Sequence, residues 1–259
     1  MKKKNNKKLN LIYRVGNKEN DIKYFKHLLP LDIDNVIEPF GGSFQVIKNI
    51  YFDDKYNKYV NDIDEKLIPI YKDFKKYGEY RIKMNDIGKK YLYDDIHVDI
   101  KKIMQDEEYL KLKDSNFYPY FSDTNIVRGN LFKFIKSDID FTEQYDLFDK
   151  INFTFEDYKI CIDKHYKNEN SFIFLDPPYL FSDNSNYSVQ SKKEGKDMTE
   201  IIVYILDLFK NKDTKAKFML IINDLYILRH LFKDYIKSSY KRMYQLSKKE
   251  EIHLIICNY

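Results

Sequence analysis

The sequence predicts an α/β protein whose sheet carries helices on both faces. Two observations support this class: short apolar runs alternate with segments of helical spacing, and a glycine turn follows the first apolar strand. A third feature is a polar, acidic segment, residues 77–154, that interrupts the alternation. We therefore expect one domain made of residues 1–76 and 155–259, with residues 77–154 inserted as a subdomain.

The first half of the pattern contains a strand, turn, helix, strand and helix in succession. Pro30 ends a short amphipathic helix, and the later segments follow from their apolar spacing. The expected elements are the helix Ile22–Leu29, the strand Asn35–Phe40, the helix Phe44–Tyr51, the strand Lys58–Asn61 and the helix Glu65–Lys76.

Regular alternation resumes after the inserted segment. Continuous apolar runs predict buried strands, and apolar residues at helical spacing predict the helices between them. The last two segments resemble a β-hairpin at the edge of the sheet. The expected elements are the strand Ser171–Leu175, the helix Met198–Phe209, the strand Lys217–Asn223, the helix Leu225–Tyr235 and the strands Tyr240–Leu246 and Glu251–Tyr259.

Composition excludes several classes of protein. No apolar run approaches the roughly 20 residues of a membrane helix, and no apolar stretch follows the lysine-rich start, so we expect a soluble cytoplasmic protein. The two cysteines cannot form a disulfide framework or a zinc knuckle. The five histidines lack ligand spacing, so we expect no metal.

The net charge of +4 is unevenly distributed along the 259 residues. The first eight residues hold five lysines, and the remaining 251 have a net charge of −1. Residues 77–157 sum to −5, whereas residues 210–251 sum to +6. If a polyanion binds, the N-terminal tail and the C-terminal third are therefore better electrostatic candidates than the middle, although a lysine-rich tail can equally be a solvated end.

The glycine turn suits a cofactor that contains adenosine. Gly41 and Gly42 follow the first strand, and Asp62 ends the second strand 20 residues after Gly42. Glycines let a ligand approach the backbone, and a spaced acid can accept hydrogen bonds from ribose hydroxyls.

The strongest chemical signal is Asp176, Pro177, Pro178 and Tyr179, directly after an apolar strand. Ligands of open α/β sheets bind at the carboxyl ends of the strands, where this carboxylate would lie. The prolines stiffen the turn and remove backbone donors, leaving carbonyl oxygens as acceptors. A planar amine held by Asp176 and the Pro177 carbonyl could stack its ring on Tyr179. The competing interpretation is an ordinary turn after a strand, with a surface tyrosine.

These motifs and their order resemble the Dam-type DNA adenine methyltransferases, particularly the bacteriophage members. The resemblance covers roughly the first 75 and last 105 residues. It rests on the segments Tyr13–Lys18, Ile37–Ser43, Val60–Ile63, Phe155–Asp157, Asp176–Tyr187 and Glu251–Tyr259. Asp176 follows Gly42 by 134 positions, which agrees with a family order in which target recognition is inserted between the cofactor and catalytic motifs.

The resemblance implies a Rossmann-like methyltransferase sheet and transfer of a methyl group from S-adenosylmethionine to the exocyclic amine of adenine in double-stranded DNA. The base would be flipped out of the duplex. Asp176, Pro177, Pro178 and Tyr179 would form the catalytic motif. The implied cofactor-binding residues are Tyr13, Gly16, Lys18, Glu38, Phe40, Gly41, Gly42, Ser43, Asp62, Phe155 and Asp176.

Some of these assignments have structural alternatives. Phe155 could be a core aromatic, Asp62 could cap the following helix, and Lys18 could be a solvated charge. Phe44 stands where many family members carry a glycine, and its ring could crowd the cofactor.

The inserted segment departs further from the family, because no Pro-Phe-Gly follows its Arg- and Asn-bearing stretch. Arg128, Asn130 and Tyr187 are the nucleic-acid contacts that we expect.

Other functions remain open at this point. The acidic insert could be an interface, which would make the chain a weakly active or inactive subunit that needs a protein partner. Related motifs also serve methyltransferases that act on RNA adenine or protein glutamine, and the long insert argues against the glutamine enzymes. A nucleoside-binding or structural module would leave Asp176–Tyr179 unexplained.

Overall fold

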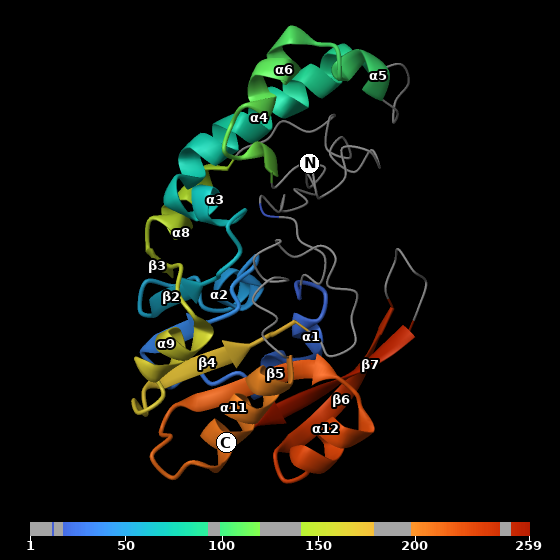
Figure 1. Cartoon of the computed structure of the whole chain (residues 1–259). Coiled ribbons are helices and arrows are strands. Elements are labelled where there is room, and N and C mark those ends of the chain that lie inside the picture. The colour runs from blue at the N-terminus through green and yellow to red at the C-terminus, as the bar shows by residue number, and fades with distance from the viewer. Residues whose placement is uncertain (1–11, 13–17, 93–98, 120–140, 179–197, 244–249) are drawn as a thin grey trace, which may run out of the picture. The chain divides into compact units, whose positions relative to one another are not determined.

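The computed structural model describes Ile12 and residues 18–92, 99–119, 141–178, 198–243 and 250–259 (Figure 1). The chain divides into two compact units. One unit, residues 16–64 and 150–259, contains the sheet and is called the sheet unit below. The other unit includes residues 65–149, and its described part is helical; it is called the helical unit.

The sheet unit is built on seven strands in the order β3-β2-β1-β4-β5-β7-β6. β1 pairs in parallel with β2 and β4, β2 with β3, and β4 with β5. β7 lies antiparallel between β5 and β6. The strands are β1 (Asn35–Glu38), β2 (Asn57–Asn61), β3 (Ile151–Thr154), β4 (Ser171–Leu175), β5 (Lys217–Asn223), β6 (Ile236–Met243) and β7 (Glu250–Cys257).

Helices cover both faces of this sheet, which confirms the predicted α/β class. The helices are α1 (Ile22–Phe25) with the 3-10 turn η1 (Lys26–Leu28), α2 (Gln45–Asn49), α9 (Tyr158–Asp163), α11 (Met198–Lys210) and α12 (Tyr226–Leu231). Side chains alternate along β4, so Ile173 and Leu175 join the core formed with α9, α11 and α12. Phe172 and Phe174 face the opposite side, where Phe174 stacks on Phe25 of α1 with ring centroids 5.6 Å apart.

Several predicted elements match the structure closely. The strands Ser171–Leu175 and Lys217–Asn223 are confirmed at both ends, and the closing hairpin forms with β6 at the edge of the sheet. The helix after β5 is shorter than the expected Leu225–Tyr235, because α12 ends at Leu231. The sequence analysis missed β3, whose pairing with β2 places residues 151–154 in the sheet rather than in the insert.

The predicted helix Glu65–Lys76 is wrong. The structure has a short helix, α3 (Ile68–Lys72), and then a long one, α4 (Phe74–Lys90). Asp73 separates them and starts α4, because its carboxylate accepts a hydrogen bond from the backbone N–H of Lys76 at 3.0 Å.

The expectation of irregular structure after Tyr77 is also wrong, since α4 continues to Lys90. Its buried residues recur at the three- and four-residue spacing of one helix face. They include Phe74, Tyr77, Tyr80, Met84 and Ile87. The helical unit also contains α5 (Ile100–Ile103), α6 (Glu107–Lys113) and α8 (Thr142–Phe148). This unit includes residues 65–149, whereas the sequence analysis expected an inserted subdomain over residues 77–154.

The turn between β1 and α2 adopts a backbone conformation that needs special residues. Gly42 has a φ of 51° and Phe44 a φ of 36°, so both lie in the left-handed region. Such a conformation costs a residue with a side chain roughly 1–2 kcal/mol. The Phe44 side chain is buried and meets the ring of Phe153 edge-on at 5.9 Å. Burial of the ring therefore opposes the strain of the backbone.

This balance predicts an unusual order of stability at position 44. Phe44→Ala keeps the strained φ and leaves a cavity, so we expect it to destabilise the protein by about 3–5 kcal/mol. Phe44→Gly should destabilise it by about 1–2 kcal/mol less than Phe44→Ala, because glycine adopts positive φ without strain. Urea denaturation of both variants measures the difference. A Gly variant less stable than the Ala variant would contradict the strain.

Candidate active site

The candidate site lies at the carboxyl ends of the central strands. From β1 the chain proceeds outward through β2 and β3, whereas β4 and β5 lie on the other side of β1. The order of the strands therefore reverses between β1 and β4, and open α/β sheets bind ligands at such a switch point. Glu38 ends β1, Asp62 follows β2 and Asp176 follows β4. The topology thus brings the three predicted acids to one edge.

Asp176 forms an ion pair with Lys18. The ammonium nitrogen of Lys18 lies 2.7 Å from both Oδ1 and Oδ2 of Asp176. Lys18 is 4% exposed, so its interpretation as a solvated charge is wrong. Burial lowers the pKa of Lys18, and the carboxylate of Asp176 opposes that shift. The pair joins the segment before α1 to the end of β4.

Glu38 is a buried acid near this pair. Its Oε1 accepts a hydrogen bond from the backbone N–H of Ile47 at 2.7 Å. Burial raises the pKa of Glu38 to about 8, and the negative charge of Asp176 acts in the same direction. Ile37 belongs to the core on the α9 side, so Glu38 points to the α1 and α2 side, as Asp176 does by alternation after Leu175.

The glycine turn is fastened to the end of β2. The backbone N–H of Gly41 donates to the carbonyl of Asn61 at 2.7 Å, and that of Gly42 donates to Oδ2 of Asp62 at 2.8 Å. Asp62 does not cap the next helix, because α3 begins six residues later at Ile68. Its second oxygen accepts from the backbone N–H of Asp64 at 2.9 Å. Phe44 turns its ring into the core against Phe153.

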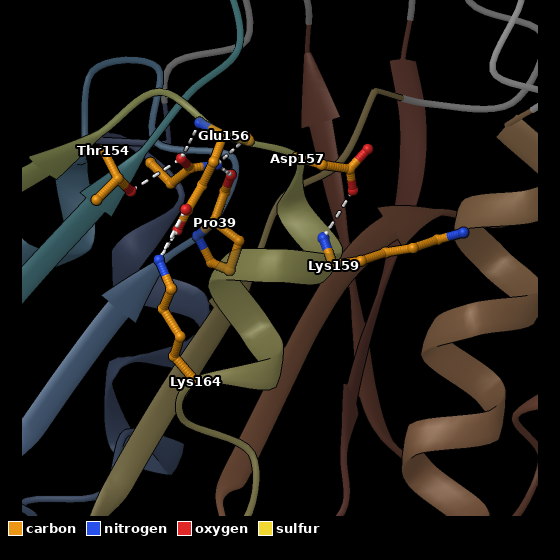
Figure 2. Close-up of polar contacts among 7 residues, drawn as sticks. Pro39, Thr154, Glu156, Asp157, Lys159 and Lys164 are labelled. Atoms are coloured by element: carbon orange, nitrogen blue, oxygen red, sulfur yellow. Dashed lines mark hydrogen bonds and ion pairs between the residues drawn. The ribbon is translucent and has the colours of Figure 1, made fainter.

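Asn61, at the end of β2, connects the loops after β1 and β3, a role that the sequence analysis missed. Its amide nitrogen donates to the carbonyls of Pro39 and Glu156 at 3.1 and 3.0 Å. Its amide oxygen accepts from the Thr154 hydroxyl at 2.9 Å and the Glu156 N–H at 3.0 Å. Figure 2 shows Pro39, Thr154 and Glu156 close to one another at this edge. The sequence signal for this role was the polar Asn61 itself, at the end of the predicted strand Lys58–Asn61.

The loop after β3 carries the predicted aromatic of the cofactor site. Phe155 is half-buried, between Thr154 and Glu156, which both bind Asn61. Glu156 also pairs with Lys164 of the segment after α9, at 2.6 Å, and Asp157 caps α9 through the N–H of Lys159 (Figure 2). The loop that holds Phe155 is therefore fixed on both sides.

The structure places part of the predicted site. It brings Lys18, Glu38 and Asp176 together, and it bonds Gly42 to Asp62 and Gly41 to the neighbouring Asn61. Phe40, Ser43, Pro177 and Pro178 lie in the turns after β1 and β4. Tyr13, Gly16, Arg128, Asn130, Tyr179 and Tyr187 lie outside the described residues.

No group of three or more His, Cys, Asp or Glu side chains in the described residues could hold a metal ion. No helix in the same residues is long and apolar enough to span a membrane.

The fold of the sheet unit is that of an α/β methyltransferase. The family model of the D12 class N6 adenine-specific DNA methyltransferases matches residues 118–252. The chain belongs to that family, and it is a site-specific DNA methyltransferase that acts on adenine. It is also 26% identical over 270 residues to the Type II methyltransferase M.CviBI of Paramecium bursaria Chlorella virus NC1A, covering 94% of this chain and 97% of the relative. The predicted family and Rossmann-like fold are thereby confirmed.

Replacing Asn61 tests its connecting role. Asn61→Ala leaves two carbonyls and one backbone N–H without this partner, so we expect the free energy of unfolding to fall by about 1–3 kcal/mol. Asn57→Ala is the matched control, because the side-chain amide of Asn57 on the same strand makes an exposed hydrogen bond to Asn35. The control should change stability by less than about 0.5 kcal/mol. Equal losses in urea denaturation would show that Asn61 has no special role.

The raised pKa of Glu38 predicts a pH-dependent stability. Between its usual value of 4.5 and about 8, the folded state keeps a proton that the unfolded state releases. The free energy of unfolding should therefore fall as pH rises through this window, and Glu38→Gln should weaken the fall. Urea denaturation at several pH values between about 5 and 9 measures it. Asp32→Asn, which changes an exposed carboxylate, is the control. Parallel curves for the wild type and Glu38→Gln would refute the assignment.

Proposed function

We propose that the chain transfers the methyl group of S-adenosylmethionine to the exocyclic amine of adenine in double-stranded DNA, with the target base flipped out of the duplex. The observation that carries this is the position of Asp176. It follows β4 at the switch point, bound by the buried Lys18 and close to the buried Glu38. A carboxylate fixed at a ligand-binding edge is suited to orient an amine.

The residues at this edge fit S-adenosylmethionine by their chemistry. The cofactor carries a sulfonium, an amino group, ribose hydroxyls and an adenine. Glu38 is a buried acid that a cationic amino group would help to ionise. Asp62 keeps acceptor capacity for ribose hydroxyls while it binds Gly42, because a carboxylate has about four acceptor positions. Phe155 offers a ring for the adenine.

The remaining cofactor residues follow from their places in the same turns. Phe40, Gly41 and Ser43 belong to the turn after β1, and its glycines allow close approach to the backbone. Tyr13 and Gly16 precede Lys18 in the chain, and we assign them to the same site.

The catalytic task is orientation and polarisation. When bound, the cofactor supplies an electrophilic methyl group on its positive sulfur. Asp176 accepts a hydrogen bond from the adenine amine and stabilises the positive charge that grows on this nitrogen. The Pro177 carbonyl accepts the second N–H, which fixes the direction of the nitrogen lone pair. Lys18 holds the Asp176 carboxylate in position through contacts with both oxygens.

DNA binding is assigned to both units. The adenine amine lies inside the duplex, so the enzyme must extrude the base, and we assign the face of Tyr179 to stack on it. We assign target recognition to the helical unit, with Arg128 and Asn130 as contacts, and a further DNA contact to Tyr187. The similarity to a viral Type II methyltransferase supports a defined target sequence. We place the reaction in the cytoplasm.

Replacing Asp176 tests the proposal. Purified protein is incubated with labelled S-adenosylmethionine and unmethylated genomic DNA, RNA or protein extract. We expect label in DNA adenine, and Asp176→Asn should lower the rate by at least about 100-fold. Asp32→Asn, a change of an exposed carboxylate in the sheet unit, should retain activity.

The other outcomes separate the alternatives. Label in RNA adenine and not in DNA would make the chain an RNA methyltransferase. Cofactor binding in calorimetry without transfer to any substrate would indicate a subunit that needs a partner. Full activity of Asp176→Asn would overturn the role of this carboxylate.

A further inference from the structure

A second group of buried charged side chains lies beside the Lys18–Asp176 pair. Asp21, at the start of α1, forms an ion pair with Arg242 of β6, with 2.9 Å between Oδ2 and Nη1. Asp21 is 3% exposed, and the Arg242 side chain is 14% exposed. None of these residues belongs to the catalytic or cofactor motifs. Burying a charge pair so deeply has a high cost in desolvation free energy. Its position beside Lys18 gives the pair a role at the site.

Besides Arg242, two uncharged side chains hold Asp21: Tyr240 bonds to it directly, and His253 bonds to Tyr240. The Tyr240 hydroxyl donates to Oδ2 of Asp21 at 3.3 Å, and Nδ1 of His253 lies 3.3 Å from the same hydroxyl. Since the hydroxyl proton is directed to Asp21, Nδ1 of His253 is the donor to Tyr240. Burial lowers the pKa of His253 to about 3, so the ring is neutral. Tyr24 stacks on Tyr240 at 4.7 Å and fixes its ring.

The backbone ties Asp21 directly to Lys18. The carbonyl of Lys18 accepts hydrogen bonds from the backbone N–H groups of Asp21 and Ile22 at 2.9 and 3.0 Å. Contacts that hold Asp21 in place therefore also hold the turn from which the Lys18 side chain extends. These contacts come from Arg242 and Tyr240 of β6, a strand at the edge of the sheet.

The charges around Lys18 come from several elements and act in opposite directions. Burial lowers the pKa of Lys18, and the positive charge of Arg242 lowers it further. Asp176 and Asp21 raise it. His253 is neutral and contributes no opposing charge. Asp21 has two effects at once, because it attracts the ammonium of Lys18 and neutralises the cation that would repel it.

We propose that Asp21 is a positioning residue for methyl transfer: held by Arg242 and Tyr240, it keeps Lys18 charged and directed at Asp176. This inference rests on the proposed function for its effect on catalysis, but the state of Lys18 can be measured without any substrate. A structural salt bridge with no link to the site would stabilise the fold and leave the ionisation of Lys18 unchanged.

The inference predicts the direction in which each variant moves the pH dependence. Asp21→Asn removes the negative charge that pairs with Arg242 and attracts Lys18, so Lys18 should lose its proton at a pH lower by about one unit or more. The alkaline limb of the single-turnover methyl-transfer rate should shift to lower pH by the same amount. Asp21→Glu keeps the charge and should retain most of the wild-type profile. Removing both charges, in Asp21→Asn with Arg242→Gln, should return the limb towards the wild-type position.

A second readout reports on Lys18 itself. Protein labelled with ¹³C-lysine is titrated by NMR, and the Lys18 signal is the one that disappears in Lys18→Arg. Tyr240→Phe removes one hydrogen bond to Asp21 and keeps the ring, so it should shift the Lys18 titration in the same direction as Asp21→Asn, by less. This variant tests the inference even if Asp21→Asn does not fold. Asp32→Asn, an exposed aspartate paired with Lys217, should leave the titration unchanged.

The outcomes distinguish the two proposals. Unchanged Lys18 titration in folded Asp21→Asn or in Tyr240→Phe overturns the positioning role. If the wild type methylates DNA and Asp176→Asn does not, that result leaves the proposed function standing. A shifted Lys18 titration in a protein that transfers no methyl group supports the positioning role and overturns the proposed function.

Discussion

The parallel pairing of β1 with β4 determines where the charged groups of the site lie. It places the carboxyl ends of both strands side by side and makes their junction the point at which the order of the strands reverses. Glu38 and Asp176 are separated by more than half of the chain, yet they occupy neighbouring strand ends on one face. Burial raises the pKa of Glu38, and Asp176 is close enough for its negative charge to act in the same direction.

Burial sets the electrostatic character of this edge. Lys18, Asp21 and Glu38 are almost inaccessible to solvent, and each has its pKa moved toward the neutral form. The structure compensates with a short ion pair at Asp176, a second pair at Arg242 and a backbone donor at Glu38. Such sites, where desolvation and specific charges act together, are where perturbed pKa values accompany function.

The turns around the site are fixed by polar groups at strand ends. Asn61 connects the loops after β1 and β3, while Asp62 binds the glycine turn. The backbone of Phe44 adopts a conformation that usually favours glycine, and its ring packs in the core beside Phe153. A bulky residue at this position therefore packs into the core.

Much of the fold could be predicted because local patterns carry it. The strands Ser171–Leu175 and Lys217–Asn223 are continuous apolar runs, and their ends were found from the sequence. β3 was missed because Ile151–Thr154 is short and only partly buried. The helix expected over Glu65–Lys76 failed at Asp73, whose capping bond starts a new helix there, and the apolar face of α4 was overlooked within a polar segment.

The sequence by itself determined the α/β class, the glycine turn with its spaced acid, and the Asp176–Tyr179 motif, because each is a run of neighbouring residues with a chemical meaning. Only the tertiary structure decided that Lys18 is a buried partner of Asp176, that Asp62 binds Gly42, and that Arg242 and Tyr240 hold Asp21 beside them. These contacts join positions far apart in the chain. They are stronger in the water-poor interior than in solvent, and that interior forms only when the chain folds.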